Sequence, residues 1–431
     1  MRFALVNPNW SFPGSIYFGC REPHLPLEFG YGKALLEREG HDVLLVDAQL
    51  EDLGAHEVKE RIGEFLPHFT VITTAPSYLF WRCAPPELRL PIQMVSELRS
   101  VGGEIVVVGP HASTTPRATL RKTQADAVLL GECEDLLPKL AHPWSQMQSI
   151  AFWAGSDVWV QGGLNSTDMN TLPALHWPDS LVRRHAHQHH RFDAKPAGPG
   201  AEVEASRGCP YHCTFCAKDN FRDKYRRRPV PLILDEVDGL LAQGVEYIYF
   251  IDEIFLPNKE LLEGLAERRV KIGVQTRVDL WSHEMLDLLG RAGCVSIEAG
   301  VESITEEGRA ALDKKCKMST AELTERLIYA KQRVPFVQAN LIEMEEDDLQ
   351  AVEAWRHELQ SAGVWANKPV PLYPYPGSPD YTNRWGAPDD RAWERAHEYY
   401  LKLYNEFSDI QEQRPVPLEE LEGTALAGQA R

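Results

Sequence analysis

The sequence lacks three features that define other classes of protein. No apolar run approaches the roughly 18 residues of a membrane-spanning helix, and the residues after Met1 become polar too soon for a signal peptide. Acidic residues outnumber basic ones, and the net charge of −18 argues against a general nucleic-acid binder. The 8 cysteines among 431 residues do not resemble a secreted disulfide framework. We therefore expect a cytoplasmic protein without a membrane span or a nucleic-acid partner.

Three of these cysteines, Cys209, Cys213 and Cys216, are spaced C-x3-C-x2-C. Thiolates in such a turn can bind one soft metal centre. A second C-x-x-C is missing, whereas structural zinc sites usually pair short ligand units and need four ligands. Zinc with His212 or a distant histidine as fourth ligand is the alternative. A 4Fe–4S cluster held by three thiolates leaves one iron open for a small molecule.

Residues 1–144 repeat an apolar strand followed by a helix-length segment, which predicts a Rossmann-like parallel sheet covered by helices. The expected strands are Phe3–Val6, Asp42–Val46, Thr70–Thr74, Glu104–Val108 and Ala127–Leu130. Ligands bind at the carboxyl ends of such strands. The candidate ligand-binding residues there are Thr73, Thr74, Ser77, Gly109, His111, Gly131 and Glu132. No G-x-G-x-x-G follows the first strand, so a dinucleotide is poorly supported.

The rest of the chain divides into three parts. Residues 145–200 read as a connector with a hairpin, and residues 201–388 resume the alternation of strands and helices. Residues 389–431 read as a helix followed by a loose tail rich in Pro, Glu, Ala and Gly. The six strands expected in the third part are Val203–Ser206, Tyr247–Ile251, Ile272–Thr276, Val295–Ala299, Phe336–Ile342 and Val364–Leu372.

The cysteine loop, entered through Ser206-Arg207-Gly208-Cys209-Pro210, resembles that of radical S-adenosylmethionine enzymes. The resemblance implies a partial (βα)6 barrel and a 4Fe–4S cluster on the three cysteines. It also implies that the open iron takes the amino and carboxylate groups of S-adenosylmethionine, with Phe215 near the adenine. Relatives often carry Gly-Leu-Pro-Gly-Glu after the fifth barrel strand. This chain has Asn340-Leu341-Ile342-Glu343-Met344 there, so its backbone approach to adenosine must differ.

The first domain resembles the cobalamin-binding domain that precedes many radical S-adenosylmethionine barrels. Four short stretches match in order: Pro26–Tyr31, Gly40–Val43, Val108–His111 and Gly131-Glu132. The resemblance implies bound cobalamin, with His111 near its nucleotide tail. The D-x-H-x-x-G loop that supplies an axial histidine in other carriers is absent, so we expect no imidazole on cobalt from the first loop. A flavodoxin-like fold without a ligand is the alternative.

Polar side chains at predicted strand ends of the barrel are the further candidates. Asp252 and Glu253 follow the second strand; the resemblance implies contact with the amino group of S-adenosylmethionine, and a structural salt bridge is the alternative. Arg277 ends the third strand, where a guanidinium suits bidentate capture of the methionine carboxylate. Glu302 and Ser303 match a Gly-Val-Glu-Ser step that faces the ribose or methionine end.

The resemblance implies a cobalamin-dependent enzyme that methylates an unactivated carbon of a small molecule or natural-product intermediate. A 5′-deoxyadenosyl radical would take hydrogen and methylcobalamin would deliver the methyl group, with electrons from an external flavodoxin- or ferredoxin-type donor. A non-methylating radical rearrangement or cyclisation is the alternative among enzymes. The alternative from another class is a metal-stabilised binding protein without turnover.

Overall fold

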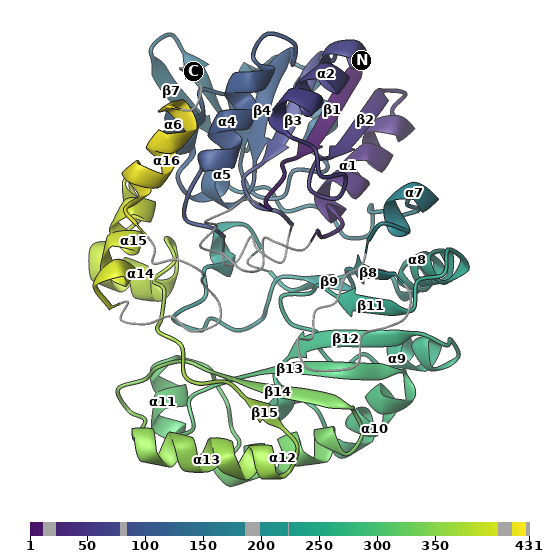
Figure 1. Ribbon diagram of the computed structural model, residues 1–431, viewed down its shortest axis with the longest axis vertical. Coiled ribbons are helices and arrows are strands. Elements are labelled where there is room, and N and C mark those ends of the chain that lie inside the picture. The colour runs from purple at the N-terminus through teal and green to yellow at the C-terminus, as the bar shows by residue number, and fades with distance from the viewer. Residues whose placement is uncertain (12–22, 78–83, 186–198, 223, 404–415, 428–431) are drawn as a thin grey trace. The chain divides into compact units, whose positions relative to one another are not determined.

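The computed structural model describes residues 1–11, 23–77, 84–185, 199–222, 224–403 and 416–427 (Figure 1). The chain forms two compact units. The first unit contains Met1–Leu175, Cys216–Asp223 and Tyr373–Arg431, and the second contains His176–Phe215 and Lys224–Leu372. The chain therefore enters the first unit three times, and the boundary between the units passes through the cysteine loop.

The first unit is built on a seven-stranded sheet with the order β2-β1-β3-β4-β5-β6-β7. Its strands are β1 Arg2–Asn7, β2 Asp42–Asp47, β3 Phe69–Thr73, β4 Glu104–Val108, β5 Ala127–Leu129, β6 Ile150–Ala154 and β7 Asp157–Gln161. The first five run parallel, as the apolar runs predicted. The hairpin β6–β7, expected in the connector, adds antiparallel strands beside β5.

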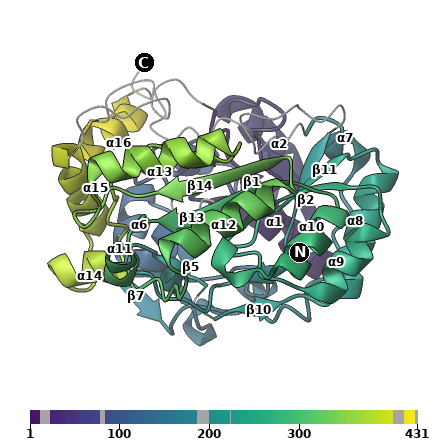
Figure 2. The same cartoon turned by 90° about the horizontal axis from the view of Figure 1, so that it is seen from below.

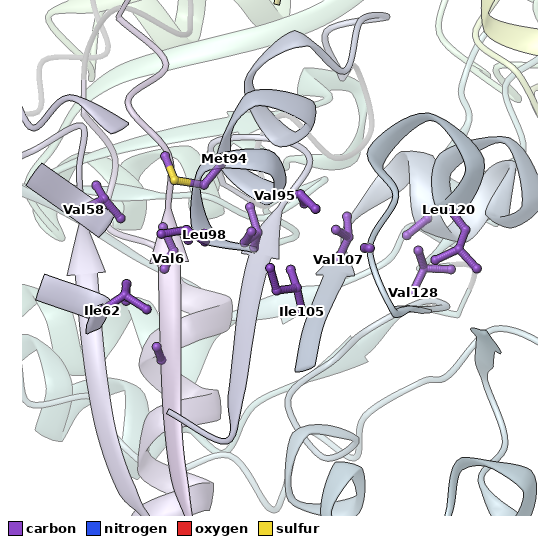
Figure 3. Packing of buried hydrophobic residues seen from close by; sticks show 14 of the residues in the cluster. Val6, Val58, Ile62, Met94, Val95, Leu98, Ile105, Val107, Leu120 and Val128 are labelled. Carbon is purple, nitrogen blue, oxygen red and sulfur yellow. The ribbon is translucent and has the colours of Figure 1, made fainter. Parts of the chain in front are cut away.

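Helices cover this sheet and enclose an aliphatic core. They are α1 Leu27–Arg38, α2 Ala55–Phe65, α4 Arg89–Leu98, α5 Pro110–Thr114 and α6 Pro116–Thr123. Figure 3 shows side chains of α2 and α4, such as Val58 and Leu98, beside Val6 of β1 and Ile105 of β4. Burial of these branched side chains at roughly 25 cal/mol per Å² of apolar surface stabilises the layered arrangement.

The second unit is built on a six-stranded sheet with the order β15-β14-β13-β12-β11-β8. Its strands are β8 Gly200–Val203, β11 Tyr247–Phe250, β12 Lys271–Thr276, β13 Cys294–Glu302, β14 Phe336–Leu341 and β15 Trp365–Ala366, all parallel. The helices between them are α8 Val230–Ala242, α9 Lys259–Ala266, α10 His283–Arg291, α11 Glu306–Ala311, α12 Thr320–Lys331 and α13 Leu349–Ser361. In Figure 2, α8, α9, α10, α12 and α13 follow one another along the outside of the strands. This is the predicted partial (βα)6 barrel.

The C-terminal part returns to the first unit as three helices: α14 Pro379–Trp385, α15 Ala392–Leu403 and α16 Leu418–Ala427. The expectation of a loose tail is wrong for α16, which packs against α4. The Glu422 carboxylate accepts a hydrogen bond from the Leu88 backbone N–H (3.1 Å) and pairs with Lys122 (2.8 Å). These contacts hold α16 against the first unit, although the composition of this helix does not predict a buried face.

In the described ranges, no helix is both long and apolar enough to cross a bilayer.

Candidate functional site

The loops after β3, β4 and β5 meet at one end of the first sheet. The Thr74 backbone N–H donates to the Val108 carbonyl (2.8 Å). Gly109 has a φ of 128°, and a Cβ added there would lie 2.4 Å from the Thr74 hydroxyl oxygen. The Ser113 hydroxyl donates to the Gly109 carbonyl (2.8 Å) and accepts from the Gly131 N–H (2.9 Å). Predicted site residues from three separate loops therefore lie together, and glycine is required for the close approach.

Three hydroxyl groups at this end have no hydrogen-bond partner within the described part of the chain. They belong to Thr73, Thr74 and Ser77, which are fully buried. A buried hydroxyl without a partner costs about 1–3 kcal/mol. Groups of this kind suit a bulky ligand that carries hydrogen-bonding amide side chains, as cobalamin does. The residues present thus fit the predicted ligand.

Two other predicted contacts have partners within the first unit. The Glu132 carboxylate accepts from the Thr167 N–H (2.7 Å) and lies 3.5 Å from the Arg222 guanidinium, and both charged side chains are fully buried. The His111 ring stacks on Trp393 of α15. Sequence reasoning missed Arg222 and Trp393 because each lies far along the chain from its partner.

The start of the loop after β1 is tied to the ends of β1 and β2 by side-chain hydrogen bonds. The Asn7 side-chain amide donates to Asp47 (2.9 Å) and accepts from the Trp10 indole N–H (3.0 Å). Residues 7–11 contain no histidine. No histidine of these residues can therefore bind cobalt, and the absence of an imidazole ligand from this loop stays a prediction.

The cysteine loop follows the short strand β9 Ser206–Arg207, which pairs with β10 Arg226–Arg227. Gly208 has a φ of 76°, a left-handed conformation that glycine adopts without strain. Its N–H donates to the Glu253 carboxylate (2.9 Å), and the Thr214 N–H donates to the Leu312 carbonyl (3.0 Å). Two backbone hydrogen bonds thus fix the loop on either side of its first two cysteines.

The thiols of Cys209, Cys213 and Cys216 are all free of disulfides. Cys213 is buried, whereas Cys209 and Cys216 are partly exposed. Across the described ranges, no three His, Cys, Asp or Glu side chains gather closely enough to hold a single metal ion. A 4Fe–4S cluster binds each of its thiolates at a different iron. Three reduced thiols in one short loop are a donor set that fits the cluster.

Both carboxylate oxygens of Asp252 accept hydrogen bonds inside the second unit. One carboxylate oxygen accepts from the Ala205 N–H (2.8 Å) and the other from the Ser206 hydroxyl. Burial raises the pKa of Asp252 to about 8, although these two hydrogen bonds oppose the shift. A carboxyl held neutral attracts an ammonium group only weakly. Asp252 thus helps to fix the segment that leads into the cysteine loop, and its contact with S-adenosylmethionine stays a prediction.

Arg277 lies beneath the cysteine loop with its charge already paired. Its Nε and Nη2 atoms donate to the two oxygens of Asp279 (3.1 and 2.7 Å), and Nη1 donates to the Lys314 carbonyl (2.5 Å). The edge of the guanidinium that suits bidentate capture of a carboxylate is therefore occupied by Asp279.

Glu302 ends β13 in an unusual backbone conformation, and Ser303 follows it. Glu302 has a φ of 65°, and its carboxylate pairs with the buried ammonium of Lys314. The Ser303 hydroxyl donates to Asp347 (2.7 Å). The left-handed backbone conformation is uncommon for residues other than glycine, and such residues cluster at functional sites. Lys314 gave no sequence signal, because the segment around it has no motif.

Comparison with known proteins agrees with this architecture. Residues 203–353 match the Radical SAM superfamily. An uncharacterized methyltransferase of Pyrococcus horikoshii is 25% identical over 70% of this chain and 66% of its own length. The anaerobic magnesium-protoporphyrin IX monomethyl ester cyclase of Cereibacter sphaeroides is 23% identical over 86% of this chain and 63% of its own length. The chain thus spans just under two thirds of these relatives.

The solved structure of the radical S-adenosylmethionine methyltransferase TsrM from Kitasatospora setae has a similar fold. That structure, with tryptophan and an S-adenosylmethionine analogue bound, superposes with a TM-score of 0.69 at 19% identity, over 89% of this chain and 76% of TsrM. A second TsrM structure contains cobalamin and a 4Fe–4S cluster. Residues 203–353 thus match a radical S-adenosylmethionine domain, and the fold has a Rossmann-like domain ahead of the partial barrel in the chain. Both findings agree with the resemblance, and the fold class predicted from the sequence is confirmed.

Proposed function

We propose that this chain is a cobalamin-dependent radical S-adenosylmethionine enzyme that methylates an unactivated carbon of a small molecule. The observation that carries the proposal is the pairing, in one chain, of a three-cysteine loop with a strand-end site of unpartnered buried hydroxyls. The methyltransferase name of one relative and the cofactors bound in TsrM support it.

In this proposal Cys209, Cys213 and Cys216 hold the cluster. Phe215, partly buried beside the last cysteine, covers the adenine. Glu253 and Glu302 would contact the amino and ribose groups, although each also has a partner in the fold, the Gly208 N–H for Glu253 and Lys314 for Glu302. Both carboxylate oxygens of Asp252 and the Ser303 hydroxyl make hydrogen bonds within the fold. When bound, the cluster supplies the electron that cleaves S-adenosylmethionine, and cobalamin supplies a transferable methyl group.

The first unit would hold cobalamin through Thr73, Thr74 and Ser77, with Gly109 and Gly131 allowing close approach. A Cβ on Gly131 would lie 2.4 Å from the Asn165 carbonyl oxygen, so the backbone is already as close there as packing permits. His111 and Glu132 would help to fix this end of the sheet, because His111 stacks on Trp393 and Glu132 pairs with Arg222. The chain's residues bind and orient the ligand and exclude water from it.

The overall reaction balances with two molecules of S-adenosylmethionine and two electrons. The substrate C–H hydrogen goes to 5′-deoxyadenosine, one methyl group goes to the substrate carbon, and methionine and S-adenosylhomocysteine are released. The electrons come from an external flavodoxin- or ferredoxin-type protein in a reducing cytoplasm. These partner and location assignments belong to the proposal.

Product stoichiometry tests the proposal. The reconstituted protein is given reductant, both cofactors and candidate substrates, and 5′-deoxyadenosine and S-adenosylhomocysteine are quantified. Methylation predicts comparable amounts of the two, because each turnover consumes one S-adenosylmethionine by each route. Reconstituted protein that binds zinc, shows no iron–sulfur absorption and releases no deoxyadenosine contradicts the proposal and favours a binding protein.

A radical cyclisation is the second candidate. The observation in its favour is the similarity to the anaerobic cyclase over 86% of this chain. Cyclisation predicts deoxyadenosine with a genuine product but without matching S-adenosylhomocysteine. That result would support cleavage of S-adenosylmethionine to a radical and would contradict the proposed methyl transfer.

A further inference from the structure

The guanidinium of Arg277 lies over the ring of Tyr211, with its central carbon 4.1 Å from the ring centroid. Tyr211 stands in the cysteine loop between Cys209 and Cys213. Stacking of this kind stabilises an exposed pair by about 0.5–1 kcal/mol and a desolvated pair by about 2 kcal/mol or more. Arg277 is 5% exposed whereas Tyr211 is partly exposed, so the contact lies between these two cases.

The position of Arg277 is fixed from behind. Asp279 engages two of its nitrogens and the Lys314 carbonyl engages the third. Lys314 is itself held by its ion pair with Glu302. The guanidinium plane is therefore oriented without a ligand. The face of this plane contacts Tyr211 of the loop, whereas its nitrogen atoms donate to Asp279 and to the Lys314 carbonyl.

The contact completes a set of three anchors on the cysteine loop. Backbone hydrogen bonds hold Gly208 and Thr214, through Glu253 and Leu312. Tyr211 lies between these two points. The stacked pair therefore holds the middle of the loop through a side chain.

We propose that Arg277 is a positioning residue that holds the cysteine loop in its cluster-binding shape by stacking on Tyr211, and that it is not the receptor of the S-adenosylmethionine carboxylate. The inference rests on the proposed function, because it requires that the loop binds a cluster. It replaces the bidentate carboxylate contact that the residue type alone suggested.

The rate of iron loss to a chelator in the absence of S-adenosylmethionine is the first measurement. It reports loop opening and does not depend on turnover. R277Q and Y211L are each expected to release iron about 2- to 30-fold faster than wild type, the range that corresponds to one lost stacking contact. The double variant should be no faster than the quicker single variant, because both remove the same interaction. Y211F keeps the ring and should behave as wild type.

The affinity for S-adenosylmethionine, read from its effect on the electron paramagnetic resonance signal of the reduced cluster, is the second measurement. Once compared at equal cluster content, R277Q and Y211L should change this affinity equally. Iron release unchanged in both variants, with affinity lost in R277Q alone, would overturn the inference and restore the carboxylate contact. Additive effects on iron release would overturn it as well. If wild type itself assembles no cluster, the proposed function fails first, and the two failures are thereby distinguished.

Discussion

The imidazole of His111 and the indole of Trp393 are stacked, with ring centroids 4.2 Å apart and planes inclined by 28°. His111 stands in the loop after β4, and Trp393 lies in α15 near the C-terminal end of the chain. Both side chains are buried in the first unit. The C-terminal helices therefore form part of the strand-end region, and a ligand at that end meets a histidine already covered on one face.

Burial lowers the pKa of His111 to about 3, with the nearby Lys122 charge adding to the shift and the carbonyls of Pro86 and Pro85 opposing it. The ordinary value is near 6.5, so the unfolded chain takes up a proton that the folded chain does not as pH falls from about 6.5 to 3. Stability from this group is present above pH 6.5 and is lost below it, by at most about 1.4 kcal/mol per pH unit.

The variant H111F keeps an aromatic ring against Trp393 and cannot titrate. We expect its melting temperature to fall less than that of wild type between pH 7 and pH 5, as measured by circular dichroism at several pH values. H56F serves as the control, because the His56 side chain is exposed on the surface of α2. Parallel curves for wild type and H111F would contradict the assignment of a buried neutral imidazole.

Asp252 predicts the opposite pH dependence. Its folded pKa of about 8 lies above the ordinary value of 3.8. The folded protein therefore holds a proton that the unfolded chain has released, and stability falls as pH rises from about 4 to 8. Asparagine can accept from the Ala205 N–H with its oxygen and donate to Ser206 with its nitrogen. D252N should thus lose less stability than wild type between pH 6 and pH 8, in unfolding by urea; an equal loss in both proteins would show that Asp252 is ionised.

The unpartnered hydroxyl of Thr74 allows a test of the first-unit site. T74V removes a buried polar group without a partner, so the ligand-free protein should be as stable as wild type or more stable, by about 1 kcal/mol. The same change should weaken cobalamin binding about tenfold, because one hydrogen bond to the ligand is lost. Thermal unfolding and a cobalamin titration followed by absorbance measure the two effects.

Thr70 on β3 is the matched control. Its hydroxyl donates to the Gly102 carbonyl (2.6 Å), so T70V should destabilise the protein by about 1–2 kcal/mol and leave cobalamin affinity unchanged. A T74V protein that loses stability as T70V does, with unaltered cobalamin binding, would assign Thr74 to the fold rather than to the ligand.

The sequence was sufficient to predict the framework, for a physical reason. Buried parallel strands appear as apolar runs, and their carboxyl ends meet at one edge of a sheet, so Thr74, Gly109 and Gly131 could be grouped before the structure was known. The cysteine loop could be predicted as a metal-binding site for a similar reason, because its three cysteines lie close together in the sequence.

Partners across long distances in the chain could not be predicted in the same way. Lys314 and Trp393 lie in segments without motifs, and only tertiary packing brings them to Glu302 and His111. The partner of Arg277 was not predicted either. Its residue type and strand-end position suggested a ligand contact, but its Nε and Nη2 atoms donate to the carboxylate of Asp279, two residues later. The α16 helix was missed because helix formation there depends on packing against α4 rather than on periodicity.

The last prediction concerns the thiols. Replacing any one of Cys209, Cys213 or Cys216 with alanine should abolish the cluster and reductive cleavage of S-adenosylmethionine, because two thiolates leave one more iron without a protein ligand. Cys294 and Cys316 are the controls within the second unit. Burial raises the pKa of both thiols, which disfavours the thiolate that binds metal, and the Cys294 thiol donates to the Ser296 carbonyl (3.3 Å).

Iron and labile sulfide per chain, with absorbance near the visible cluster band, measure the outcome. C294A and C316A should keep wild-type iron content, although C294A opens a small cavity in a buried position and should lower stability by about 1 kcal/mol. A stability measurement on every variant separates loss of the cluster from loss of the fold. Cluster content that survives in C213A, or that disappears in C316A, would assign the metal to a different set of thiols, since each of the three loop cysteines is required only if all three bind iron.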